Sequence, residues 1–185
     1  MLTNLIDLWL PIVLSTVALF FVSFLSWMVL QFHRQDWLKL DNEDQFLKAV
    51  QECHLKPGNY MFPGCKTPEE RNSAEFKKKL EAGPHGVMTV FSHTGMARNL
   101  ALTFVYFLVV NFCLAYLAGM VLHRGADYMP VFRFMSTATF LVYLAGIVPH
   151  AIWFRCRIVG HIIDSLLYAV IVGVIFMAMW PGVSS

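Results

Sequence analysis

The chain has 185 residues, of which 57% are hydrophobic and only 14% are charged, and its mean hydropathy is +0.57. Soluble domains carry about 25% charged residues. The composition therefore excludes an ordinary soluble domain and indicates a protein that has lipid as its solvent. The net charge of +2 gives no indication of nucleic-acid binding, because the basic residues are interleaved with acidic ones.

Four apolar runs follow one another along the chain, at about residues 8–30, 99–122, 131–154 and 158–180. Each has the roughly 20 residues that a helix needs to cross a bilayer. No basic residue precedes the first run and no small-residue cleavage site follows it, so we expect an anchor rather than a cleaved signal peptide. The predicted fold class is an all-α membrane protein: a single membrane domain of four transmembrane helices, with a small α+β insert at residues 31–98.

The basic residues predict the orientation of these helices. Ten of the 14 Lys and Arg lie in the insert, and Arg155 and Arg157 lie in the turn between the third and fourth runs. Only Arg124 and Arg133 fall on the opposite side. Because loops rich in Lys and Arg stay in the cytoplasm, we expect a multi-pass protein with both termini outside and residues 31–98 cytoplasmic.

The insert is expected to fold in the order helix, strand, helix, strand. Asn59–Phe62 and Val87–Phe91 are the expected strands, lying side by side. The signals that begin or end its helices are Asp41, Thr67 with Glu70 as a capping box, Pro68 and Gly83. With so few large apolar side chains the insert cannot hold a deep core alone, so we expect it to rest on the helix ends.

The cysteines of the insert give little indication of a metal site. Cys53 and Cys65 lie in the expected cytoplasmic segment, where thiols stay reduced. Together with His54 and either His85 or His93 they could bind a metal, but their spacing matches no known zinc pattern. No metal and no cofactor is therefore expected.

Several short motifs resemble those of an uncharacterised group of small four-helix bacterial inner-membrane proteins. The group has a Pro-Gly-x-Tyr-x-Phe-Pro stretch, a Gly-Pro-x-Gly-x-x-Thr-Val stretch, and a C-terminal Asp-Gly-Leu-x-Tyr followed by Trp-Pro. The chain carries "PGNYMFPGC", "GPHGVMTV", "DSLLYA" and Trp180-Pro181, with Ser165 where the group has glycine. The resemblance implies a bacterial inner-membrane location and four helices, and it implies no activity.

Polar and small residues form stripes on the last three helices. Positions three, four and seven apart share a helix face. The fourth helix carries His161, Asp164, Ser165 and Tyr168 in one stripe, and the other two stripes are Asn111, Ala115 and Gly119, then Thr139, Tyr143, Gly146 and His150. Small residues let helices approach and polar residues bond across the contact. We expect Asn111, Ala115, Gly119, Thr139, Tyr143 and Gly146 to pack helices together.

The candidate site is a polar intramembrane cluster near the cytoplasmic helix ends. Its predicted members are His150, Arg157, His161, Asp164 and Tyr168, with His33 and His93 at the same level. An unpaired carboxylate facing hydrocarbon is costly. We therefore expect Asp164 to point into the bundle, with a polar partner from the third helix, the 155–157 turn or the insert.

Three functions are left open by these residues. The leading hypothesis is a non-enzymatic accessory or assembly subunit of an inner-membrane complex, with a protein partner or a second copy of the chain. A small oligomeric proton or ion conductor that uses His161 and Asp164 is the second. A bundle that binds haem or a metal through facing histidines is the third. No nucleophile, base and orienting group come together in the sequence, so no catalytic residue is predicted.

Overall fold

The computed structural model describes residues 3–92, 95–154 and 156–182. The chain divides into two compact units. Met1–Leu38 and Ala97–Ser185 form the first, which we call the bundle, and Lys39–Met96 form the second, which we call the insert unit. The boundaries of the insert unit fall inside the insert expected at residues 31–98.

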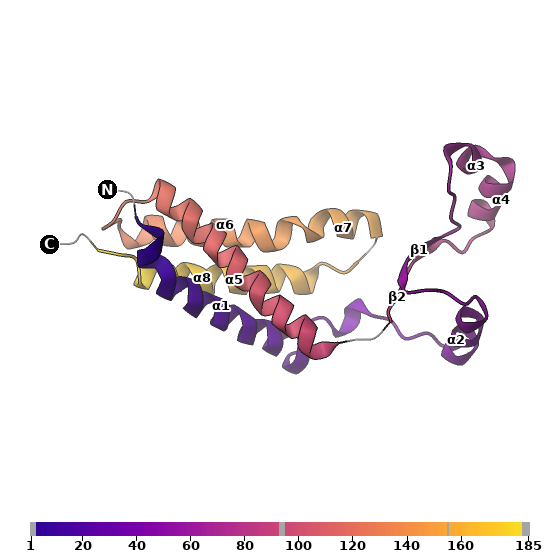
Figure 1. Ribbon diagram of the computed structural model, residues 1–185, viewed down its shortest axis with the longest axis horizontal. Coiled ribbons are helices and arrows are strands. Elements are labelled where there is room, and N and C mark those ends of the chain that lie inside the picture. Colours follow the sequence, from indigo (N-terminus) through magenta and orange to yellow (C-terminus); the bar gives the residue numbers. More distant parts are fainter. Residues whose placement is uncertain (1–2, 93–94, 155, 183–185) are drawn as a thin grey trace. The chain divides into compact units, whose positions relative to one another are not determined.

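Four helical segments of the bundle are long and apolar enough to cross a membrane, as predicted. They comprise Leu5–Val29, Met96–Val121, Tyr128–Phe154 and Val159–Ala178. The first contains a 3-10 turn (Leu5–Leu8), helix α1 (Trp9–Phe24) and a π-helical turn (Leu25–Val29). The others are α5 (Met96–Val121), α6 (Tyr128–Ala145) with α7 (Ile147–Phe154), and α8 (Val159–Ala178). Helix α1 begins and α8 ends at the same end of the bundle (Figure 1).

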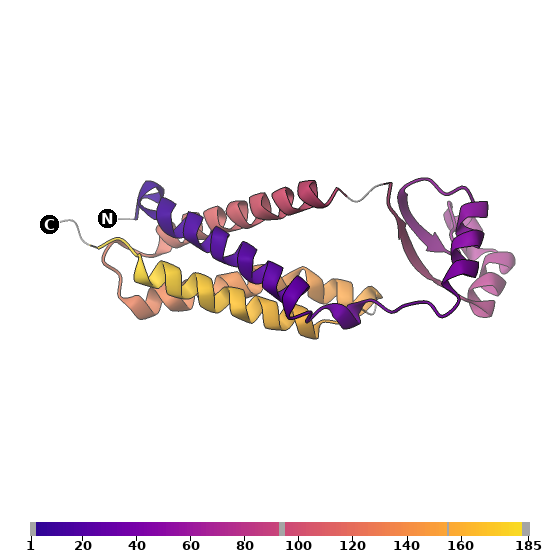
Figure 2. The same ribbon diagram turned by 90° about the horizontal axis from the view of Figure 1, so that it is seen from below.

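Helix α8 is the centre of the bundle. It is the most buried of the four segments, and its most extensive contact is with α6. Helices α1 and α6 both lie beside it (Figure 2). Gly173 lets α6 approach closely, because a Cβ atom there would lie 2.9 Å from Cδ2 of Phe132. The buried apolar side chains of α8 are Tyr168, Ala169, Val172 and Phe176.

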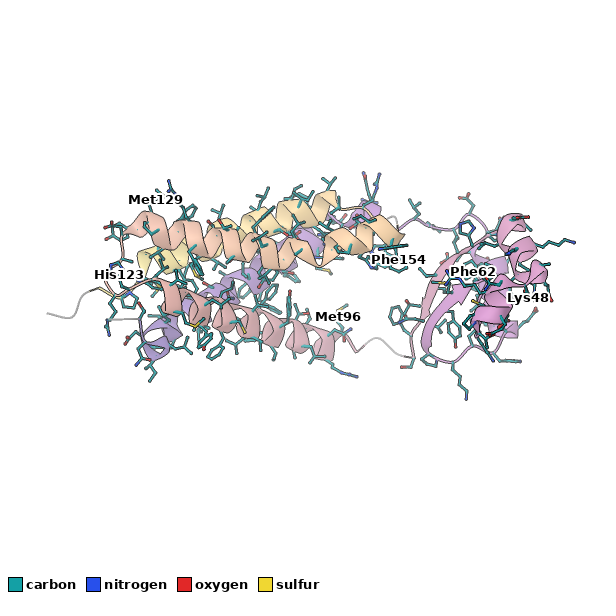
Figure 3. All side chains as sticks on the ribbon, turned by 90° about the horizontal axis from the view of Figure 1, so that it is seen from above. Lys48, Phe62, Met96, His123, Met129 and Phe154 are labelled. Carbon is teal, nitrogen blue, oxygen red and sulfur yellow. The ribbon has the colours of Figure 1, made fainter. Side chains whose placement is uncertain are left out.

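The third span is not one continuous helix, although its sequence was expected to form one at residues 131–154. Helix α6 ends at Ala145, and α7 begins at Ile147. Pro149 explains the interruption: proline has no N–H, and its ring collides with the carbonyl of the residue four positions earlier, which is Ala145. The two helices still follow each other from Met129, at one end of the bundle, to Phe154 at the other (Figure 3).

Hydrogen bonds connect the loop between α5 and α6 to the segments before α1 and after α8. Thr3 Oγ1 donates to the Leu122 carbonyl at 3.0 Å, and Arg124 donates to Asp7 at 2.9 Å. On the other side, the Trp180 indole donates to the His123 carbonyl at 3.0 Å. The start of α1, the loop and the end of α8 are therefore held together at one end.

The insert unit contains α2 (Glu43–Glu52), β1 (Gly58–Phe62), α3 (Pro68–Asn72), α4 (Ala74–Ala82) and β2 (Gly86–Val90). The predicted order of helix, strand, helix and strand is confirmed, with the second helix in two pieces. The strands are antiparallel, and Asn59 lies opposite Thr89 while Met61 lies opposite Val87. Thr89 Oγ1 donates to Asn59 Oδ1 at 2.9 Å, on the sheet face that also carries Met61 and Val87.

The helix ends of the insert unit follow local chemistry. The Glu70 N–H donates to Thr67 Oγ1 at 3.2 Å, as expected for a helix that begins at Pro68, and Gly83 ends α4 with φ +58°. Two expectations were wrong. Ser73 caps α4 through the Phe76 N–H and so divides the expected single helix, and α2 begins after Asn42 rather than after Asp41.

The described residues of the insert unit include no buried core. Within residues 39–92 and 95–96, every side chain is at least partly exposed. The exposed ones include large apolar residues: Met61 is 65% exposed, Val87 54% and Phe91 71%. The position of this unit on the bundle, expected from the sequence, stays a prediction.

Candidate functional site

A buried carboxylate, Asp164, is the centre of the polar site. It lies in the second turn of α8 and is only 5% exposed. Ser26 Oγ donates to Asp164 Oδ1 at 2.5 Å, and His33 Nε2 lies 3.0 Å from Asp164 Oδ2. Both carboxylate oxygens therefore have a partner from the end of the first span. The prediction that Asp164 points into the bundle is confirmed.

The expected source of these partners was wrong. We expected the third helix, the 155–157 turn or the insert, and the partners come instead from residues 26–33. The first span reaches back because it does not end as a regular helix. Its last turn is π-helical, Gln31 has a left-handed backbone with φ +53°, and the Phe32 N–H donates to the Ser26 carbonyl at 3.1 Å. This bend turns the next residue, His33, toward α8.

His33 is held on every side. It is 2% exposed, its ring stacks on Trp27 with centroids 4.0 Å apart, and its Nδ1 lies 2.7 Å from Asp36 Oδ2. Residues 34–36 form a 3-10 turn, which places side chains three positions apart on the same side. Asp36 therefore reaches one ring nitrogen of His33 while Asp164 reaches the other.

The remaining predicted cluster residues lie at different depths. The half-buried ring of His161 lies 4.6 Å from that of His33 between centroids. Tyr168 is buried, one turn further along α8, against Phe107 and Tyr143. Asp164, His161 and Tyr168 thus line one inward face of α8.

Two predicted members lie at the surface instead. His150 is exposed on α7, where its ring lies 4.8 Å from that of Phe154. Arg157 is also exposed, and it donates to Gln35 Oε1 at 2.5 Å rather than to a carboxylate. Gly146, the preceding member of the same stripe, is exposed as well, so the stripe leaves the bundle interior beyond Tyr143. His93, expected at the same level, lies outside the described residues.

Five of the six expected packing residues are at least partly buried. Asn111, Ala115, Gly119 and Thr139 are buried, and Tyr143 is partly buried. Asn111 Nδ2 donates to Thr16 Oγ1 at 3.3 Å, and a Cβ atom at Gly119 would lie 3.0 Å from the Thr3 carbonyl oxygen. Gly146 does not pack, because no atom lies within 4 Å of the position of its absent Cβ.

Ser26, Trp27 and Asp36 belong to the site but were not predicted. Sequence spacing offered a signal for Asp36, since it follows His33 by three residues. Ser26 and Trp27 could not be assigned to the site from a regular helical period, because the π-helical turn changes which residues share a face.

The arrangement permits two kinds of chemistry. The first is a tie between the first and last spans, made by hydrogen bonds to a buried carboxylate. The second is binding of a cation by imidazole and carboxylate groups. Haem does not fit between His33 and His161, because ring centroids 4.6 Å apart leave no room for a porphyrin. Cys53 and Cys65 are exposed and join no group of three possible metal ligands among the residues described.

The chain matches no protein-family model, no curated protein and no solved structure. The resemblance to small bacterial inner-membrane proteins thus stays a prediction from the motifs.

Proposed function

We propose that the protein is a non-enzymatic accessory or assembly subunit of a bacterial inner-membrane complex, and that the insert unit binds its protein partner. The observation that carries this proposal is the exposure of the insert unit. All its described side chains are at least partly exposed, although it has regular helices and a paired sheet. A unit of this size without a core needs an outside surface to cover its apolar side chains.

A protein surface suits the insert unit better than lipid headgroups do. The unit has eight basic and eight acidic residues, so its charges cancel. Attachment to anionic headgroups depends on an excess of Lys and Arg. The exposed sheet face instead combines Met61 and Val87 with the polar pair Asn59 and Thr89. Apolar residues beside satisfied polar groups are typical of protein interfaces.

The bonding of Asp164 also supports a subunit without a conducting role. Each oxygen of this carboxylate has a partner within the chain, Ser26 or His33. The partners lie 138 and 131 residues away in sequence, so the bonds connect the first span to the last. This is the arrangement of a helix-to-helix tie, and it favours the accessory subunit over the alternative proton or ion conductor.

The orientation proposed from the sequence is consistent with this function. Both termini would be periplasmic and the insert unit cytoplasmic, because the basic residues concentrate around the insert. The partner would then be a membrane protein with a cytoplasmic surface, or a cytoplasmic protein recruited to the membrane.

Native mass spectrometry of the full-length protein, extracted from its own membranes in mild detergent, tests the proposal. We expect a defined complex with a different protein. Met61→Glu places a charge on the exposed sheet face and should release that partner, while Gln45→Glu places the same charge on exposed α2 and should retain it. A wild-type protein found only as a monomer or as a homo-oligomer would contradict the proposal.

A further inference from the structure

We propose that His33, Asp36 and His161 bind a divalent transition-metal ion of the Zn²⁺ class, with Asp164 supporting His33 from behind. One possible ligand atom from each of these three residues lies within 4.8 Å of the others. The site is independent of the insert unit and of the proposed partner.

Each ring nitrogen of His33 lies beside a different carboxylate, that of Asp36 or that of Asp164. Asp36 Oδ2 lies 2.7 Å from Nδ1, and Asp164 Oδ2 lies 3.0 Å from Nε2. Metal-binding histidines almost always direct their second ring nitrogen to a carboxylate or carbonyl group, which fixes the tautomer and the ring orientation. The ion would therefore lie on the Nδ1 side of His33, between Asp36 and His161, while Asp164 holds Nε2.

Asp164 is itself fixed for this supporting role. Ser26 Oγ donates to its other carboxylate oxygen at 2.5 Å, and Asp164 is 5% exposed. A carboxylate that is bonded at both oxygens cannot rotate away from His33. The same bonds that tie the helices thus orient the proposed ligand.

The surroundings of His33 are built around its ring. Trp27 covers one face at a centroid distance of 4.0 Å. At Gly160, a Cβ atom would lie 2.8 Å from His33 Cε1, so the ring occupies the space that a side chain would take. The left-handed backbone of Gln31 turns the chain just before this residue. A histidine fixed in this way loses little freedom when it binds an ion.

A small movement would complete the coordination. Ligand atoms around a tetrahedral ion with bonds of about 2.0–2.1 Å are about 3.3 Å apart, so the separation of up to 4.8 Å must shorten and the 2.7 Å between His33 Nδ1 and Asp36 Oδ2 must lengthen. His161 can supply this movement, because its side chain is only half buried at the start of α8. When the ion binds, the Nδ1–H proton of His33 is released to solvent, so that Nδ1 and Asp36 Oδ2 can each donate a lone pair to the metal.

The donor set selects the class of ion. Two imidazoles and one carboxylate suit Zn²⁺ and its neighbours in the transition series, whereas Mg²⁺ and Ca²⁺ prefer oxygen ligands throughout. Three protein ligands leave at least one coordination position for water or for a side chain of another protein.

Metal binding to the full-length protein in detergent tests the inference. One Co²⁺ ion should bind per chain and show the visible absorption of cobalt in a low-symmetry site. Zn²⁺ should displace this Co²⁺. His161→Gln removes a ligand and should weaken Co²⁺ binding by at least about 100-fold. Asp164→Asn should weaken it by about 10–100-fold, as for other supporting groups.

His150→Gln is the matched control, because it removes an exposed histidine outside the ligand set and should leave Co²⁺ affinity unchanged. The thermal unfolding of each variant, measured without metal, separates loss of a ligand from loss of the fold. The inference is wrong if the folded wild-type protein binds less than about a fifth of a Co²⁺ ion per chain. It is also wrong if His161→Gln and His150→Gln bind Co²⁺ equally well.

Discussion

Replacing Gly160 by alanine should destabilise the bundle, although the same change usually stabilises a helix. The added Cβ would lie 2.8 Å from Cε1 and 3.0 Å from Nδ1 of His33. Carbon atoms in favourable contact are about 3.5–4.0 Å apart, so the His33 ring must move by roughly 0.7 Å or more. Trp27 and the two carboxylates oppose that movement.

The magnitude follows from two opposing terms. Overpacking at a filled site costs about 1–3 kcal/mol, and a shift of the ring also lengthens its bond to Asp164. Alanine recovers at most about 1 kcal/mol of helix propensity, and less here because Gly160 is the second residue of α8. We expect Gly160→Ala to lower the free energy of unfolding by about 1–2 kcal/mol, which corresponds to about 2–8 °C in Tm for a chain of this size.

Gly146→Ala is a control of the same chemistry. Gly146 has a helical backbone (φ −70°, ψ −31°) and no atom within 4 Å of its Cβ position. Alanine there should raise stability by about 0.5–1 kcal/mol, so the two alanines should differ in sign.

Thermal unfolding of the full-length protein in one detergent measures both variants. A double-mutant cycle with His33→Ala identifies the cause, because the cost of Gly160→Ala should vanish when the ring is absent. If Gly160→Ala is as stable as the wild type while His33 is intact, the proposed close packing of this ring against α8 is refuted.

Three further predictions concern the tie, the orientation and the insert unit. Asp164→Asn should preserve the fold, because an amide still forms hydrogen bonds. Asp164→Leu leaves Ser26 and His33 without their partner and should lower the free energy of unfolding by about 1–2 kcal/mol. Equal stability of the two variants would contradict the tie. A reporter fused to the C-terminus should be active only if it functions in the periplasm, and cytoplasmic activity would reverse the proposed orientation. In a background with Cys53 and Cys65 replaced by serine, the pair Asn59→Cys and Thr89→Cys should form a disulfide on mild oxidation, because Thr89 is the residue opposite Asn59. The pair Asn59→Cys and Met88→Cys should not form one. The reverse result would indicate a strand register shifted by one residue.

The spans and the strands could be predicted because their signals are local. The continuous apolar runs around Leu19 and Val172 are long enough for helices that cross a membrane, and the β-branched and aromatic residues around Thr89 are typical of a strand. The break before α7 was also local, since Pro149 is visible in the sequence, but the hydropathy of the run concealed it.

The partners of Asp164 could not be predicted in this way. A regular helix through Ser26 would continue past Val29, whereas the chain forms a π-helical turn and then a left-handed residue at Gln31. Glutamine has no special preference for that backbone. The bend is therefore selected by the contacts it permits, between His33 and α8, and these depend on residues 131 positions apart.

The separation between His33 and Asp164 has a consequence for synthesis of the protein. The first span leaves the ribosome long before the last, and the 131 residues between the bonded side chains take about 7–26 s to translate at about 5–20 residues per second. During that interval Ser26 and His33 lack the Asp164 carboxylate to which they later bond. A nascent chain arrested before α8 would leave Ser26 Oγ and His33 Nε2 without this partner. Helix α8 is therefore the element whose synthesis completes the tie.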